Sequence, residues 1–254
     1  MNNIVLITGA TSGFGEACAR LFASKGHDLI LLGRRIDRLN SLKSELTKAH
    51  KRSIIVCSVD VRDEEQVNNT IENFSPEVKS RLAILVNNAG LAVGRGPINE
   101  GTTEDWNRMI DTNVKGLLYV TRAVAPIFIQ NGQGHIINMA SVAGKEVYPG
   151  GNVYCASKHA VDALSRAMRI DLVEHNIKVT NIAPGAAETE FSIVRFKGDE
   201  TAAKTVYDGY VPLNADDVAD AVYYAASRPA HVHIQDIVIT PAAQASTTVF
   251  NKKA

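Results

Sequence analysis

The chain has 254 residues, of which 45% are hydrophobic and 21% charged, and its 27 basic and 27 acidic residues give a formal net charge of zero. This length is ordinary for a single α/β domain with one buried core. The balanced charge argues against a nucleic-acid binder held by an excess of basic residues. The composition also excludes a disordered chain, which would be poor in apolar residues or strongly charged.

The sequence indicates a protein that does not cross a membrane. Its longest clear apolar run, residues 123–129, has seven residues, whereas a membrane span needs ~18. The N-terminus has no basic stretch ahead of an apolar one, so we predict no signal peptide. Cys18, Cys57 and Cys155 are odd in number and lack a CxxC spacing, which favours small buried side chains in a reducing compartment. We therefore expect a cytoplasmic protein.

Short aliphatic runs alternate with longer amphipathic stretches along the chain. The predicted strands are residues 4–8, 28–32, 53–59, 82–87, 134–139, 178–182 and 236–239. The predicted helices are residues 15–25, 35–48, 63–73, 103–130, 153–175 and 214–227. This alternation predicts a parallel sheet covered on both faces and connected by right-handed crossovers. We expect residues 1–254 to form one such domain.

Two segments interrupt this alternation. Residues 186–212 are long and polar and follow Pro184-Gly185, and such an insertion in a compact α/β domain is typical of a functional lid over a site. The tail, residues 241–254, has a composition that fits both an ordered C-terminal arm and a loose chain.

The first predicted strand ends in a glycine-rich turn, Thr8-Gly-Ala-Thr-Ser-Gly-Phe-Gly15, and a helix pattern follows. Glycines at this spacing allow a tight turn and a close approach of the backbone to a ligand. They also leave free N–H groups at a helix N-terminus, where the dipole favours a pyrophosphate. The turn therefore predicts a dinucleotide site, although its spacing is GxxxGxG and not the commoner GxGxxG.

The second predicted strand is followed by Arg34 and Arg35. An NAD site places an acidic residue near this point for the ribose 2′-hydroxyl, whereas an NADP site places arginine beside the 2′-phosphate. Arginine suits that task because its planar guanidinium binds phosphate through two hydrogen bonds. We therefore predict NADP(H) as the cofactor.

Tyr154 and Lys158 are four residues apart on a predicted helix and share one face. A phenol has an ordinary pKa of ~10, and a nearby ammonium would stabilise the phenolate and lower that value. Tyr154 could then remove a hydroxyl proton in oxidation, or donate one in reduction. Ser141 follows the strand at residues 134–139 and lies at the carboxyl edge, where open α/β sheets bind ligands. Its hydroxyl could hold the substrate oxygen.

Together these motifs resemble the short-chain dehydrogenase/reductase family, over essentially the whole chain. Besides the glycine-rich turn, the resemblance is carried by Asp60-Val61, Asn87-Asn-Ala-Gly90 and Pro184-Gly185, and by the set Asn113, Ser141, Tyr154 and Lys158. It implies a single Rossmann-type doubly wound domain, with a seven-stranded parallel sheet of order 3-2-1-4-5-6-7. It also implies a homotetramer.

The resemblance implies a role for each site residue. Tyr154 would be the acid/base, Lys158 would bind the nicotinamide ribose, Ser141 would orient the substrate, and Asn113 would hold a water that links the lysine to solvent. Read from the sequence alone, Asn113 also fits a helix-interior amide bonded to backbone. The cofactor residues implied are Gly9, Ala10, Thr11, Ser12, Gly13, Phe14, Gly15, Arg34, Arg35, Asp60, Val61, Asn88, Gly90, Tyr154, Lys158, Pro184, Gly185, Ala187 and Thr189.

The substrate half resembles a subgroup of that family, the NADP-dependent 3-hydroxy acid dehydrogenases. The likeness is carried by residues 150–154 and 189–199. It implies substrates such as L-serine, L-allo-threonine and 3-hydroxypropionate, which carry a hydroxyl on the carbon β to a carboxylate. Members of the subgroup differ from one another at residues 188–190, so the choice of substrate is least constrained there.

Arg195 in the predicted lid is the candidate partner of the substrate carboxylate. The sequence is equally consistent with Arg195 as a charged side chain that faces solvent. Ser141 and Tyr154 complete the predicted substrate-binding set. The seven histidines show no spacing with carboxylates that indicates a metal site.

Two other functions fit parts of the pattern. A 3-oxoacyl-carrier-protein reductase, or a general carbonyl reductase, would share the fold, but the sequence of the predicted lid is against the carrier-protein enzyme. A non-catalytic NADPH-binding sensor would not need the set Asn113, Ser141, Tyr154 and Lys158. Cofactor reduction with substrate, compared with cofactor binding without turnover, distinguishes these possibilities.

Overall fold

The computed structural model describes residues 3–253, which form a seven-stranded sheet whose neighbouring strands are all parallel. The strands are β1 (Ile4–Thr8), β2 (Asp28–Gly33), β3 (Ile54–Ser58), β4 (Leu82–Asn87), β5 (Gly134–Met139), β6 (Ile177–Pro184) and β7 (Asp236–Ile239). Their order across the sheet is β3-β2-β1-β4-β5-β6-β7. This order confirms the predicted doubly wound α/β fold.

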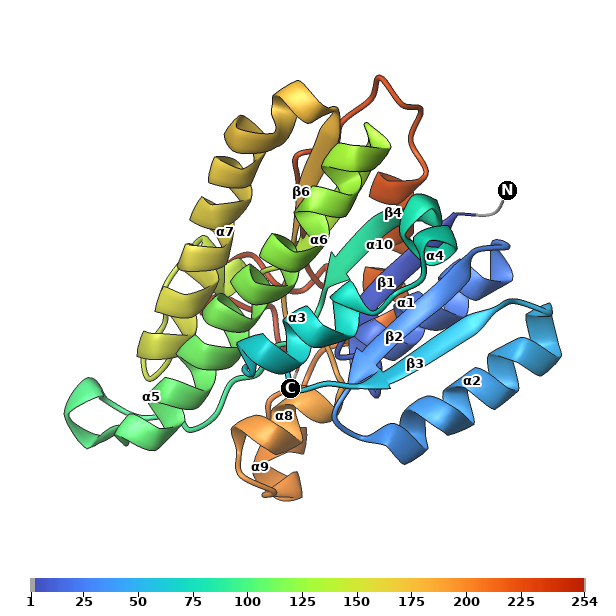
Figure 1. Ribbon diagram of the computed structural model, residues 1–254. Coiled ribbons are helices and arrows are strands. Elements are labelled where there is room, and N and C mark those ends of the chain that lie inside the picture. The colour runs from blue at the N-terminus through green and yellow to red at the C-terminus, as the bar shows by residue number, and fades with distance from the viewer. Residues whose placement is uncertain (1–2, 254) are drawn as a thin grey trace.

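Helices cover both faces of the sheet. They are α1 (Gly13–Ser24), α2 (Ile36–His50), α3 (Glu64–Glu72), α4 (Pro76–Arg81), α5 (Thr103–Ile110), α6 (Leu117–Asn131), α7 (Asn152–Leu172), α8 (Glu190–Arg195), α9 (Glu200–Thr205) and α10 (Ala215–Ala226). Helices α3, α6 and α7 lie on the near face in Figure 1, and α1 packs beside α2 and α10 on the other. No helix within residues 3–253 is long and apolar enough to cross a membrane.

The alternation of side chains along a strand divides the core into two layers. In β1, Val5 and Ile7 pack into the layer beneath α1 and α10, whereas Ile4 and Leu6 pack into the layer beneath α6 and α7. All four side chains are almost completely buried. The strand is apolar up to its last residue, Thr8, because both of its faces are covered. This is why the sequence reads as continuous apolar runs.

The predicted helix at residues 103–130 is broken in the structure. Helix α5 ends at Ile110, a π-helical turn spans Asp111–Gly116, and α6 then begins at Leu117. A Cβ added at Gly116 would lie 2.7 Å from Cγ2 of Val61, so this turn packs closely against the residues that follow β3. Such π-turns are frequent at functional sites.

Two further differences concern element bounds. Helix α4 was not predicted, although Ser75 accepts a hydrogen bond from the Val78 amide and Pro76 occupies the first turn, as expected at a helix start. Strand β6 runs from Ile177 to Pro184, beyond the predicted residues 178–182. It therefore delivers Pro184 directly to the carboxyl edge of the sheet.

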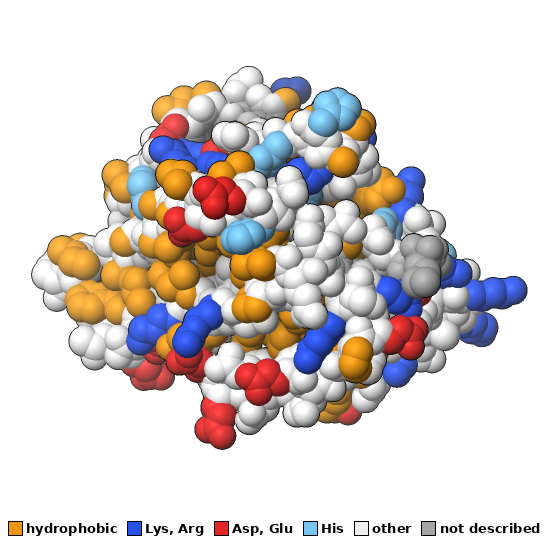
Figure 2. All heavy atoms as spheres, turned by 45° about the horizontal axis from the view of Figure 1, so that its top comes forward, with side chains coloured by type: hydrophobic (Ala, Val, Ile, Leu, Met, Phe, Trp, Pro, Cys, Tyr) orange, Lys and Arg blue, Asp and Glu red, His pale blue; other side chains and the backbone are white. Residues whose placement is uncertain are grey.

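The segment predicted as a lid, residues 186–212, contains α8 and α9. Figure 1 places both helices below the carboxyl ends of the strands, beside the C-terminus. The described part of the tail packs against this segment, because the Lys253 amide donates to the Gly209 carbonyl at 2.8 Å. Residue 254 lies outside the described residues. On the face in Figure 2, acidic and basic side chains are interspersed among apolar ones, in keeping with the zero net charge.

Candidate active site

The glycine-rich turn joins β1 to α1 at the carboxyl edge of the sheet. Gly9 and Gly13 have positive φ angles of 66° and 54°, which favour glycine. A Cβ added at Gly15 would lie 2.4 Å from both the Asn88 side-chain nitrogen and the Gly9 carbonyl oxygen. Asn88 fixes the turn by donating to the carbonyl oxygens of Thr8, at 2.9 Å, and Gly9. A substituent at Gly15 would therefore displace the turn.

A cavity of about 300 Å³ runs beside this turn. The predicted cofactor residues that line it are Gly9, Thr11, Ser12, Gly13, Phe14, Arg34, Arg35, Asp60, Val61, Asn88, Gly90, Tyr154, Lys158 and Thr189. Pro184, Gly185 and Ala187 line the neighbouring larger cavity instead. Ala10 and Gly15 lie buried within the turn. The structure thus brings the predicted cofactor residues to one edge of the sheet.

Asp60, one of the predicted cofactor residues, is paired with a neighbouring arginine. Both of its carboxylate oxygens accept from Arg62, the shortest contact being 2.6 Å to Nη2. The hydrogen bonds from Arg62 hold the pKa of the Asp60 carboxyl below its ordinary value. The backbone amide of Asp60 donates to Oε1 of Gln66.

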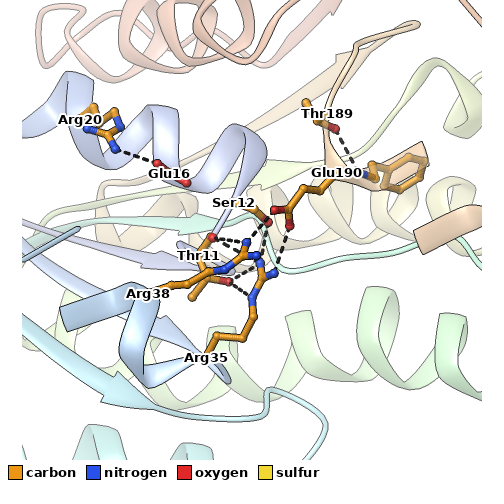
Figure 3. A network of polar contacts seen from close by, with 9 residues as sticks. Thr11, Ser12, Glu16, Arg20, Arg35, Arg38, Thr189 and Glu190 are labelled. Carbon is orange, nitrogen blue, oxygen red and sulfur yellow. Dashed lines mark hydrogen bonds and ion pairs between the residues drawn. The ribbon is translucent and has the colours of Figure 1, made fainter. Parts of the chain in front are cut away.

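Two arginines converge on one carboxylate at the outer end of this cavity. Nη1 of Arg35 lies 3.0 Å from one Glu190 oxygen, and Nη1 of Arg38 lies 2.6 Å from the other. The Arg35 guanidinium is itself held by the hydroxyls of Thr11 and Ser12, each 2.8 Å from Nη2 (Figure 3). Burial raises the pKa of Glu190, but the arginine hydrogen bonds outweigh it and lower the pKa overall. The guanidiniums of Arg35 and Arg38 thus bind one anion, the Glu190 carboxylate, between them.

Sequence reasoning found Arg35 but missed Arg38. The two residues are three apart at the start of α2 (Ile36–His50), and residues at this spacing lie on one helix face. That spacing was the available signal. The pairing with Glu190 had no local signal, because 152 residues separate Glu190 from Arg38.

Ser141 and Tyr154 come together where β5 ends and α7 begins. Ser141 follows β5, accepts from the Ala143 amide at 3.1 Å and donates to the Pro184 carbonyl at 3.3 Å. Tyr154, on the first turn of α7, is 8% exposed. Burial raises the pKa of the Tyr154 phenol, and the Ser141 hydroxyl opposes it. The side chains around Tyr154 therefore keep its proton in place.

Lys158 lies one helical turn beyond Tyr154 and is 5% exposed. Its ammonium donates to the Met139 carbonyl at 2.8 Å and lies 5.9 Å from the centre of the Tyr154 ring. Burial lowers the pKa of Lys158 from 10.5 to about 8. A Cβ added at Gly90 would lie 3.4 Å from the Lys158 nitrogen and 3.2 Å from Oδ1 of Asn113. The lysine thus lines the 300 Å³ cavity, which we call the cofactor cavity, beside the residues that follow β4.

Asn113 lies in the π-helical turn Asp111–Gly116 and is 2% exposed. Its side chain accepts from the Leu91 amide and donates to the Leu91 carbonyl, both at 2.8 Å, and it also donates to Ser157 at 3.0 Å. The amide therefore ties the chain after β4 to α7. This is the backbone-bonding arrangement considered from the sequence, and the predicted water relay stays a prediction.

A larger cavity of about 670 Å³ opens beside Tyr154 and Ser141, and Arg195 lines it. The Arg195 guanidinium donates to the Tyr148 hydroxyl at 2.9 Å, and its carbon lies 5.8 Å from the centre of the Tyr154 ring. Its Nε is buried without a hydrogen-bond partner. Arg195 is therefore half-buried on the wall of the cavity, and its contact with a substrate carboxylate stays a prediction.

The comparisons with known proteins agree on the family. A family model described as short chain dehydrogenase matches residues 3–199. The chain belongs to the short-chain dehydrogenase family.

Relatives of similar length include enzymes with different names. The chain is 48% identical to sulfoacetaldehyde reductase 2 of Chromohalobacter salexigens over 246 residues, which cover 96% of each chain. It is 45% identical to an NADP-dependent 3-hydroxy acid dehydrogenase of Escherichia coli K12, over 95% of this chain and 96% of the relative. Among solved structures, the closed form of serine dehydrogenase complexed with NADP⁺ matches with a TM-score of 0.92 and 43% identity, covering 99% of this chain and 100% of that one.

The tail contributes residues to the larger cavity, and these residues lie outside the part of the chain that the family model matches. The family model ends at residue 199, yet Gln244, Thr247 and Phe250 line the larger cavity. Oε1 of Gln244 accepts from the Ala186 amide at 2.8 Å, and this bond ties the tail to the turn after β6. The described part of the tail is thus an ordered arm, and its polar composition alone could not indicate this.

Proposed function

We propose that this short-chain dehydrogenase is an NADP(H)-dependent oxidoreductase. It interconverts the hydroxyl and carbonyl of short acids that carry a 3-hydroxyl, with Tyr154 as the acid/base. The observation that carries the proposal is the placement of a buried phenol and a guanidinium on the same cavity. Tyr154 and Ser141 would meet the reacting oxygen, and Arg195, 5.8 Å from the Tyr154 ring, would meet the acid group.

The residues present fit a nucleotide that carries a 2′-phosphate. Arg35 and Arg38 already hold the carboxylate of Glu190, which marks a position where an anion is stable. The turn beside them has no room for a side chain at Gly15, as expected where backbone N–H groups approach a pyrophosphate. When bound, NADP(H) supplies the hydride acceptor or donor. The names of the relatives support the same cofactor.

Each catalytic side chain has a task that follows from its surroundings. Tyr154 gives or takes the proton on the substrate oxygen, and Ser141, which lines the same cavity, orients that oxygen. The ammonium of Lys158 faces the cofactor cavity, 5.9 Å from the centre of the Tyr154 ring, where it would hold the ribose of the cofactor. Asn113 fixes the chain after β4 against α7. In this proposal the segment 186–212 is a lid.

Replacing Arg195 by alanine tests the substrate class. We expect kcat/KM for 3-hydroxypropionate to fall about 10- to 100-fold, because a hydrogen-bonded charge pair contributes about 1.5–3 kcal/mol. The effect should lie mainly in KM, and a neutral secondary alcohol should lose less than about threefold. Arg195→Lys should recover part of the loss, since it keeps the charge but not the paired N–H groups. Initial rates of NADP⁺ reduction provide the measurement.

An equal loss on the acid and on the neutral alcohol would contradict the proposal. It would mean that Arg195 acts through the Tyr148 hydroxyl, to which it donates, and not through the substrate. Turnover absent with every acid, in the presence of tight NADPH binding, would favour a carrier-protein reductase or a cofactor sensor.

A second candidate substrate is sulfoacetaldehyde, reduced at its aldehyde carbon. The relative that shares 48% identity is named for this activity, and the 670 Å³ cavity is roomy enough for a sulfonate beside Arg195. A guanidinium binds the oxygens of a sulfonate and of a carboxylate by the same charge-assisted hydrogen bonds. Rates of NADPH oxidation with sulfoacetaldehyde and with malonic semialdehyde, measured side by side, decide between the two.

Oligomeric state and location complete the proposal. The family resemblance supports a homotetramer, and Ile170 and Val173 on the outer side of α7 and the turn after it are 76% and 65% exposed. Large apolar side chains at this exposure are common at contacts between subunits. The absence of disulfide bonds among Cys18, Cys57 and Cys155 is in keeping with a cytoplasmic protein.

A further inference from the structure

The cluster around Glu190 contains more positive charge than one carboxylate needs. Glu190 is the first residue of α8, in the segment 186–212. Arg35 and Arg38 lie at the start of α2, which packs against the sheet. Each arginine meets a different oxygen of the carboxylate, at 3.0 and 2.6 Å (Figure 3). The contact therefore joins the proposed lid to the outer part of the cofactor cavity.

The fixed side of the cluster does not depend on Glu190. The Arg35 guanidinium is held by the Thr11 hydroxyl, 3.0 Å from Nε and 2.8 Å from Nη2, and by the Ser12 hydroxyl. These partners belong to the glycine-rich turn, so Arg35 keeps its place whichever anion it meets. The three charged side chains are 42% to 51% exposed. Ion pairs at this exposure are weak and exchange with other anions.

We propose that Glu190 is a specificity-determining residue that occupies the position of the cofactor 2′-phosphate and is displaced by it. This inference rests on the proposed function, in which that phosphate binds at Arg35 and Arg38. A phosphate monoester carries a charge of about −1.5 to −2 at neutral pH and three acceptor oxygens, so it competes for both arginines and repels the carboxylate. A free ribose hydroxyl is neutral and leaves the pairs intact. Glu190 thus weakens only the binding of nucleotides that carry the phosphate.

Displacement of Glu190 would reach the substrate side through one short helix. Helix α8 (Glu190–Arg195) carries Glu190 at its first position and Arg195 at its last. Between them, the ring of Phe191 lies 5.6 Å from the ring of Tyr154. Release of the first residue therefore loosens the element that positions the proposed carboxylate partner. Because such coupling is reciprocal, substrate binding would alter phosphate binding by the same factor.

The test compares two nucleotides that differ only in the phosphate. Isothermal titration gives the Kd of adenosine 2′,5′-bisphosphate and of 5′-AMP for the wild type and for Glu190→Gln, at one fixed ionic strength. We expect the substitution to tighten binding of the bisphosphate about 3- to 5-fold, the upper part of the range of one exposed charge pair. Binding of 5′-AMP should stay within about twofold. Glu188→Gln is the matched control, because Glu188 is exposed on the same segment and forms no ion pair in the described structure. It should change neither Kd.

Each contrary outcome has a separate meaning. If Glu190→Gln binds the bisphosphate as weakly as the wild type, or more weakly, Glu190 closes over the bound nucleotide and the inference is wrong. If Glu188→Gln has the same effect as Glu190→Gln, the effect is one of net charge, and the inference is again wrong. If the wild type binds the two nucleotides equally well, no 2′-phosphate site exists at the arginines, and the proposed cofactor fails with the inference.

Discussion

Replacing Tyr154 by phenylalanine is expected to lower kcat about 10²- to 10⁴-fold, the usual contribution of a positioned acid/base. The substitution removes one hydroxyl and keeps the ring that packs against Phe191. The loss should lie in kcat, while the Kd of adenosine 2′,5′-bisphosphate stays unchanged because the arginine cluster is untouched. Initial rates with 3-hydroxypropionate and NADP⁺, together with titration of the bisphosphate, provide the measurement.

The control for this variant is Tyr223→Phe. Tyr223 lies on α10, where its ring contacts Phe22 and His27 on the far side of the sheet from Tyr154. Its loss of a hydroxyl should leave kcat within about twofold. Retention of more than a tenth of the wild-type kcat by Tyr154→Phe would show that another group moves the proton, and the mechanism proposed above would have to be abandoned.

The sheet was predictable because its signal is local. The central strands are buried on both faces, so Ile4–Thr8 and Leu82–Asn87 are apolar up to their last residue. The interruption of the helix at residues 111–116 was not predictable, because Gly116 there packs closely against Val61 from another part of the chain, and such a contact leaves no local signal. A helical hydrophobic pattern runs through that turn unchanged.

The site residues also fall into those with a local sequence signal and those without one. Tyr154 and Lys158 share a helix face, and the glycine-rich turn follows β1. Their spacing in the sequence was therefore enough to predict them as site residues. Glu190 and the tail residue Gln244 act through contacts with residues far away in the sequence, namely Arg38 and Ala186. Residue spacing along the chain cannot predict a contact between residues so far apart in the sequence. The parts of the site that sequence reasoning missed are those that depend on contacts between distant segments.

Replacing Lys158 by methionine is expected to abolish turnover and, at the same time, to stabilise the fold. Burial lowers the pKa of Lys158 from 10.5 to about 8, so the folded protein binds this proton less tightly than the unfolded chain. Below the folded pKa the lysine is charged in both states, and the penalty on the folded state is complete. It amounts to about 3 kcal/mol, since one pKa unit corresponds to about 1.4 kcal/mol.

Methionine removes that penalty at similar volume but loses the hydrogen bond to the Met139 carbonyl, which costs about 1 kcal/mol. The net gain of about 1 to 2 kcal/mol should raise Tm by roughly 2 to 8 °C for a chain of this size. Thermal unfolding followed by circular dichroism at about pH 7 gives the comparison with the wild type.

The pH dependence separates this cause from a general improvement in packing. As pH rises from about 8 to 10.5, the wild type loses the buried charge first in the folded state, so its own stability increases through that window. The advantage of Lys158→Met should therefore shrink with rising pH and reverse above about pH 10.5, where only the lost hydrogen bond remains. An advantage that is constant with pH would exclude the buried charge as its source. We expect the pH-dependent result, because Lys158 is 5% exposed and its ammonium has one hydrogen-bond partner in the described structure, the Met139 carbonyl.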